Sequence, residues 1–127
     1  MNAFYISDED TPADIEHGGD LALVVIGGEV DYAVSPQLRE HINARIRDGA
    51  RSIVLDLAAV TFIDSTAIGV LVGTVMRLHE LGEGSLTVVC GSENERVKRI
   101  FEIAGIDSLI ALHCSRDDAF STLAAAH

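Results

Sequence analysis

The sequence predicts a single-domain α/β protein with a mixed, mostly parallel sheet of four to five strands and about four helices. Three observations indicate this fold class. The chain has 127 residues, which suits one domain. Short apolar runs rich in β-branched residues alternate with amphipathic stretches, and such an order requires crossover helices packed on a parallel sheet. Apolar residues make up 48% of the chain, enough for a hydrophobic core, which excludes a disordered chain.

The first strand and helix are expected between residues 21 and 49. Residues 21–28 form a continuous apolar run that ends in Gly-Gly, which is typical of a strand buried on both faces. After a turn at 29–32, Ser35 supplies a hydroxyl cap and Pro36 suits the first helical position. Gly49 ends this helix. Its buried face is predicted at Leu38, Ile42 and Ile46.

A second strand and helix follow between residues 53 and 82. Residues 53–57 are short and β-branched and are predicted to form a strand, from which 60–63 lead out. A helix is expected over 66–81, and Gly82 ends it. Its apolar stripe repeats at intervals of three and four, at Ile68, Leu71, Val72, Val75 and Leu78.

The last third of the chain repeats the alternation. Residues 86–90 are predicted to form a buried strand. Ser92 and Glu95 have the spacing of a capping box, which starts a helix that Gly105 ends. A final strand is expected at 109–112, and Ser115 is expected to cap a closing helix.

Residues 1–20 are predicted to be an acidic lead-in before the domain at 21–127. This lead-in holds six of the net eleven negative charges, so it is expected to be solvated and partly mobile. The sequence leaves open whether 4–6 adds an edge strand. Nucleic acid is excluded as a direct partner, because phosphate recognition depends on clustered Lys and Arg. The six acidic residues are Asp8, Glu9, Asp10, Asp14, Glu16 and Asp20.

Membrane insertion, metal binding and catalysis are not expected. The longest apolar stretches are too short to cross a bilayer and no signal peptide is present, which predicts a cytoplasmic protein. Cys90 and Cys114 lack metal-ligand spacing and are expected to be packed thiols. The five histidines have no zinc-type spacing, so neither a metal nor another cofactor is implied. No convergent acid, base and nucleophile can be identified, so the protein is not predicted to be an enzyme.

The most informative segment is the strand-to-helix transition at Asp64, Ser65 and Thr66. One interpretation is simple capping, because side-chain oxygens accept hydrogen bonds from the first amides of a helix and stabilise it by about 1 kcal/mol each. The other is a phosphorylation switch, because a helix N-terminus tolerates a phosphate well. A phosphate there would place new charge in any partner interface.

Three segments together resemble the STAS domain of bacterial anti-sigma factor antagonists: Gly28-Glu29-Val30-Asp31, residues 64–69 and residues 97–106. The resemblance runs from about Leu21 to Leu123. It implies a STAS fold and a protein that binds an anti-sigma factor, itself a serine/threonine kinase, and thereby releases a sigma factor. It also implies that the kinase phosphorylates the domain, that the phosphorylated domain dissociates from the anti-sigma factor, and that a phosphatase reverses the modification. By position the acceptor is Thr66, with Ser65 as the alternative, and the partner-binding residues are Asp31, Asp64, Ser65, Thr66 and Ala67.

Two departures from that family pattern concern the acceptor turn. Ala67 stands where the family usually has glycine, and Thr66 stands where serine is commoner. Alanine favours a helix by about 1 kcal/mol over glycine, which predicts a stiffer turn. Three alternatives stay open at this point: a STAS scaffold or regulatory module of a signalling or transport complex that is never phosphorylated, a domain that binds a small ligand such as a nucleotide, and a homodimer.

Overall fold

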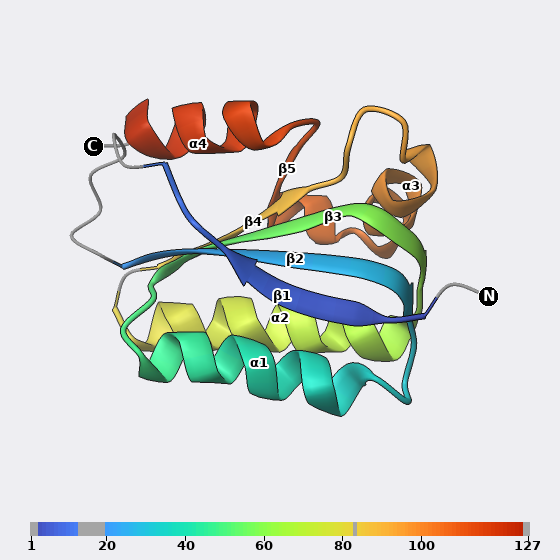
Figure 1. Ribbon diagram of the computed structural model, residues 1–127, viewed down its shortest axis with the longest axis horizontal. Helices are drawn as coiled ribbons and strands as arrows, with labels where there is room; N and C mark the ends of the chain where they lie inside the picture. Colours follow the sequence, from blue (N-terminus) through green and yellow to red (C-terminus); the bar gives the residue numbers. More distant parts are fainter. Residues whose placement is uncertain (1–2, 13–19, 83, 126–127) are drawn as a thin grey trace.

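Five strands lie side by side in the order β1-β2-β3-β4-β5 in the computed structural model, which describes residues 3–12, 20–82 and 84–125 (Figure 1). β1 runs antiparallel to β2, and every other neighbouring pair is parallel. The predicted α/β class with a mixed, mostly parallel sheet is therefore confirmed. The strands are β1 (Tyr5–Glu9), β2 (Leu21–Val30), β3 (Ser52–Ile63), β4 (Ser85–Val89) and β5 (Ala111–His113).

The helices cover both faces of the sheet (Figure 1). They are α1 (Ser35–Arg47), α2 (Ser65–Glu80), α3 (Glu95–Ala104) and α4 (Arg116–Ala125), with the short 3₁₀ helix η1 (Ile106–Ser108) after α3. The larger core joins the sheet to α1, α2 and α3, and Phe101 of α3 is fully buried in it. A smaller core lies beneath α4, made by Leu23, Val54, Val89, Ala119 and Phe120.

The apolar stripes of the first two helices lie where the sequence predicts them. The three predicted positions of α1 are buried, and so are Leu71, Val75 and Leu78 of α2, while Ile68 and Val72 are half-buried at the margin of the core. Gly105 ends α3 with a φ of 73°, in the left-handed region that glycine adopts at little cost. The Ser115 hydroxyl accepts a hydrogen bond from the Asp118 amide at 3.1 Å, so the predicted cap of α4 is also confirmed.

Two predicted caps are wrong. Ser35 is already helical, and its hydroxyl donates to the Asp31 carbonyl at 2.9 Å instead of capping α1. The capping box at Ser92 does not form either, because Asn94 is the N-cap of α3 and accepts from the Val97 amide at 3.4 Å. At α1 the Asp31 side chain bonds the backbone amides of the preceding turn, whereas at α3 the Asn94 side chain also bonds β3.

β2 and β3 are longer than the sequence predicts. β2 continues through Val30, where a turn was expected, and β3 continues without a break from Ser52 to Ile63. The pairing of these strands shifts register twice, and β3 holds an extra residue each time, first between Asp56 and Ala59 and then at Thr61. Ala58 and Ala59 carry no local strand signal, and they are extended because β2 pairs with the residues on either side of the first shift, Asp56 and Ala59.

Part of the acidic lead-in belongs to the sheet as β1. The Tyr5 ring lies directly over Gly27 of β2, where a Cβ atom would collide with it. Residues 13–19, with Asp14 and Glu16, lie outside the described residues. Asp8 and Glu9 are exposed, as expected of a solvated arm, but both belong to the edge strand β1, and their carboxylates are paired with helices on opposite faces of the sheet.

Ion pairs connect β1 to α1 and to α4. The Asp8 carboxylate contacts Arg45 Nη1 at 2.9 Å and His41 Nε2 at 3.0 Å, both on α1. The Glu9 carboxylate contacts Arg116 Nη1 at 2.9 Å, at the start of α4. Hydrogen bonds to Glu9 and Asp56 raise the pKa of Arg116 above its ordinary value, so it stays charged. These ion pairs hold the edge strand from both sides.

Two further expectations concern the packing of the two cysteines and the absence of a membrane-spanning helix. Cys90 is buried, as expected of a packed thiol, but Cys114 is exposed, so that expectation is wrong for Cys114. Cys114 directly follows β5, the outermost strand of the sheet on that side. Each helix in the described ranges is too short or too polar to cross a bilayer.

Candidate functional site

The first turn of α2 carries the predicted acceptor hydroxyls. Asp64 precedes the helix in an extended conformation, and its Oδ1 accepts a hydrogen bond from the Ala67 amide at 2.9 Å. Ser65 and Thr66 are both exposed, whereas Ala67 is fully buried against the core. The capping interpretation is therefore confirmed for Asp64, and the two hydroxyls remain accessible to another protein.

Asp64 also joins two segments that are far apart in sequence. Its second oxygen, Oδ2, accepts from the Tyr32 amide at 2.8 Å, while its own amide donates to the Val30 carbonyl at 3.2 Å. Both carboxylate oxygens are thus bonded within the chain. The role that geometry gives Asp64 is to hold the loop after β2 against the first turn of α2.

Asp31 shapes that same loop. Its Oδ1 accepts from the amides of Ala33 at 3.0 Å and Val34 at 3.3 Å, and its carbonyl accepts from the amide and hydroxyl of Ser35. Aspartate commonly makes such contacts with backbone amides two and three residues ahead. Asp31 therefore fixes the turn that leads into α1, and its two chain neighbours, Val30 and Tyr32, are the residues whose backbone groups bond to Asp64.

Two exposed aromatic side chains lie at the same end of the sheet, and sequence reasoning missed both. Tyr32 is 72% exposed in the loop that Asp64 holds, and Phe62 is 46% exposed near the end of β3. Phe62 is paired in register with the exposed Glu29 of β2. The alternation of β3 carries the signal for Phe62, because its neighbour Ile63 is buried and side chains along a strand alternate.

We define the docking face as the exposed and half-buried side chains gathered here: Glu29, Asp31, Tyr32, Phe62, Asp64, Ser65 and Thr66. It combines apolar area with acidic groups. The amides of Ser65 and Thr66 are in the first turn of α2, where intrahelical partners are lacking and the helix dipole is positive. A phosphate would be tolerated there locally, although it would add about −1.5 to −2 charges to an already acidic surface.

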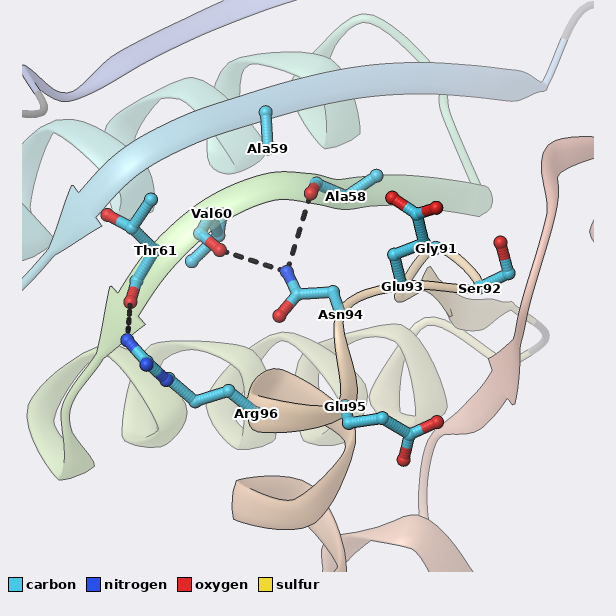
Figure 2. Close-up of a pocket in the computed structure, with 10 residues that line it drawn as sticks. All are labelled: Ala58, Ala59, Val60, Thr61, Gly91, Ser92, Glu93, Asn94, Glu95 and Arg96. Atoms are coloured by element: carbon cyan, nitrogen blue, oxygen red, sulfur yellow. Dashed lines mark hydrogen bonds between the residues drawn. The ribbon is translucent and has the colours of Figure 1, made fainter.

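A hollow of about 610 Å³ lies next to the docking face, between the irregular part of β3 and the loop before α3. Figure 2 shows the Asn94 amide pointing at β3, where it donates to the carbonyls of Val60 at 2.9 Å and Ala58 at 3.4 Å. Arg96 donates to the Thr61 carbonyl at 3.3 Å. The registered pairing with β4 ends at Asp56, so these side chains supply hydrogen bonds to the part of β3 that continues beyond it.

Asn94 is a third residue that sequence reasoning missed. Because it caps α3 and also bonds the last part of β3, it positions the strand that carries Phe62 and leads to Asp64. Glu93 and Glu95 also line the hollow. The residues that the structure describes include no cluster of three or more side chains able to hold a metal ion.

Known proteins share both the sequence pattern and the fold. The family described as STAS domain matches residues 12–126. The anti-sigma-B factor antagonist of Staphylococcus aureus is 34% identical over 87 residues, which cover 68% of this chain and 78% of that protein.

Among solved structures, an anti-sigma factor antagonist from Mycobacterium paratuberculosis superposes with a TM-score of 0.78 at 26% identity, covering 95% of this chain and 94% of that one. The unphosphorylated form of the anti-sigma factor antagonist SpoIIAA superposes with a TM-score of 0.72 at 18% identity, covering 94% and 96%. At that identity the likeness to SpoIIAA concerns the fold alone.

Proposed function

The chain belongs to the STAS domain family, and we propose that it acts in the cytoplasm as an anti-sigma factor antagonist that phosphorylation of Thr66 switches off. The observation that carries this proposal is the exposed Thr66 hydroxyl on the first turn of α2, inside a face that combines aromatic and acidic side chains. The names of the relatives support an anti-sigma factor as the partner. The protein binds and is modified, and it is not a catalyst.

The docking face supplies the binding energy in this proposal. Tyr32 and Phe62 anchor the partner in this proposal. Both aromatic side chains are exposed, and a partner that covers them removes a large apolar surface from water. Glu29 and Asp31 favour a basic surface on the partner, through complementary charge. Asp64 contributes by positioning, since both of its carboxylate oxygens are bonded inside the chain.

The switch is a charge placed in that interface. The kinase partner transfers the γ-phosphoryl group of ATP to Thr66 Oγ1, so that an O–P bond forms, the bond to ADP breaks and the hydroxyl proton leaves. The amide groups of the first turn accommodate the phosphate, and the fold stays intact. The added charge faces a partner surface shaped for a neutral hydroxyl. A loss of about 3 kcal/mol would weaken binding roughly 100-fold, and a phosphatase would restore it.

The test uses the kinase-type anti-sigma factor encoded in the same genome. The purified proteins are incubated with ATP and magnesium, and phosphate is mapped by peptide mass spectrometry. We expect one phosphoryl group on Thr66, none in Thr66→Ala, and an unchanged yield in the neighbouring control Ser65→Ala. Phosphate on Ser65 in the unaltered protein would overturn the assignment to Thr66 and leave the rest of the switch in place.

Calorimetric titration of the same pair tests the docking step. We expect the unmodified chain to bind tightly and the phosphorylated chain and Thr66→Glu to bind about 100-fold more weakly. Asp31→Lys should also weaken binding, through charge reversal beside the acceptor. Equal affinity of the phosphorylated and unmodified chains would refute the switch.

One observation favours a second function, that of a STAS scaffold without phosphate exchange. Ala67 is fully buried where the family usually has glycine, so the acceptor turn cannot be drawn out of α2 without exposing its methyl group. Binding of the anti-sigma factor without phosphate transfer under any condition would support an unregulated antagonist. The absence of both anti-sigma factor binding and phosphate transfer would support the scaffold function. A homodimer stays a prediction, which sedimentation velocity tests directly.

A further inference from the structure

The two cysteines of the chain lie at the carboxyl ends of neighbouring strands. β4 and β5 are parallel, and their last registered pair is Val89 with His113, so Cys90 and Cys114 are the next pair along. The Cys90 amide donates to the His113 carbonyl at 2.9 Å, which continues the ladder to this point. Adjacent strands are about 4.8 Å apart, within the Cα separation of roughly 4.4–6.8 Å that a disulfide spans.

The two thiols also share a face of the sheet. Val88 and Leu112 form the registered pair two residues earlier, and both pack in the larger core on the side of α3. Cys90, the residue after β4, returns to that face and packs in the larger core, and the same alternation continued one residue past β5 puts Cys114 on that face. Burial is the main reason that the pKa of the Cys90 thiol is raised to about 11, and the nearby Cys114 raises it by a smaller amount.

The pair differs in access to solvent. Cys90 is 3% exposed, whereas Cys114 is exposed at the rim of the sheet. A small oxidant therefore reaches Cys114 first, and Cys90 lies behind it as a resolving thiol. This is the arrangement of a reactive cysteine next to a partner that can trap its first oxidation product.

We propose that Cys90 and Cys114 form an intramolecular disulfide when the protein meets a peroxide, a modification site that is separate from Thr66. The Cys114 thiolate attacks hydrogen peroxide, breaking the O–O bond, and becomes a sulfenic acid. The Cys90 sulfur then attacks the Cys114 sulfur, the S–S bond forms and water leaves. In total two thiols and one peroxide give one disulfide and two waters, so the thiols lose two electrons and the peroxide gains them.

The bond would fasten the outer edge of the sheet. β5 has three residues and, among the described strands, pairs with β4 alone. The loop that the disulfide closes contains α3, η1 and β5. Closing it restricts the unfolded chain, and we expect the thermal midpoint of the oxidised protein to rise by about 5–10 °C. In the reduced protein, β5 separates from β4 more easily than in the oxidised protein.

The experiment uses the full chain, reduced, freed of reductant and treated with hydrogen peroxide. Free thiols are then blocked with N-ethylmaleimide in denaturant, and the intact mass is measured. We expect a mass loss of about 2 Da with no alkylation, a peptide that links Cys90 to Cys114, and return to two alkylated thiols after dithiothreitol. The thermal midpoint should rise with oxidation and fall with reduction.

The variant Cys114→Ser serves as the matched control, because an exposed side chain can be exchanged without disturbing the core. It should show neither the mass loss nor the shift in thermal midpoint. The proposal is overturned if peroxide converts Cys114 to sulfinic acid while Cys90 is still fully alkylated. It is also overturned if the disulfide found is intermolecular, which non-reducing electrophoresis detects as a covalent dimer. Neither result bears on the Thr66 switch.

Discussion

Replacing Asp64 with alanine removes two hydrogen-bond acceptors at once. The Ala67 amide loses its cap, which costs about 1 kcal/mol. Loss of a negative charge at the positive end of α2 costs a further 0.3–1 kcal/mol or so. The Tyr32 amide loses a charged acceptor in an exposed loop, where water replaces it in part, so about 0.5–1 kcal/mol is expected. The free energy of unfolding should therefore fall by about 2–3 kcal/mol.

Urea unfolding measures this loss. The chain has no tryptophan, so far-UV circular dichroism is the suitable signal. Ser65→Ala, at the neighbouring exposed position, should stay within about 0.5 kcal/mol of the unaltered protein. Asp64→Asn should lie between the two, because its single carbonyl oxygen can serve only one of the two amides. Hydrogen exchange should show faster exchange at Tyr32 and Ala67 in Asp64→Ala.

The reasoning is refuted if Asp64→Ala unfolds within about 0.5 kcal/mol of the unaltered protein, or if only the Ala67 amide becomes less protected. The first result would mean that water serves both amides as well as the carboxylate does. The second would mean that Tyr32 is held by something else. The measurement also guides the interpretation of binding data. If the Tyr32 amide does lose protection, a lower affinity of Asp64→Ala for the anti-sigma factor reflects a displaced Tyr32 loop and not a lost contact between Asp64 and the partner.

Arg116→Gln should lower the free energy of unfolding by about 1–3 kcal/mol in urea titrations, because it leaves the buried Asp56 carboxylate without the 2.6 Å ion pair. Glu9→Gln, at an exposed partner of the same arginine, should cost less than about 1 kcal/mol. Asn94→Leu should cost about 1–3 kcal/mol and speed hydrogen exchange in α3, through loss of the cap and of the bonds to β3. The free energy of unfolding should fall between pH 9 and 11, because the pKa of the Cys90 thiol is 9.0 in the unfolded chain and about 11 in the folded protein. The loss should reach about 2–3 kcal/mol and should be absent from Cys90→Ala.

The sequence determined the order of the elements and their buried faces. Leu38 and Leu71 lie on apolar stripes that repeat every three or four residues, and such periodicity is a local property that a chain carries into any fold. The cap at Ser115 and the helix end at Gly105 are equally local, since both depend on backbone groups within a few residues. The acceptor segment was identified in the same way, from hydroxyls that precede an apolar helix.

Only the tertiary structure decided how β3 continues and what surrounds the acceptor. Ala58 carries no local signal for a strand, and it is extended because β2 pairs with Asp56 and Ala59 on either side of it and Asn94 binds its carbonyl. Tyr32 joins the docking face because Asp64, thirty-two positions away, accepts a hydrogen bond from its amide. Long-range hydrogen bonds form only when distant segments meet, so they leave no periodic pattern in the sequence from which they could be predicted.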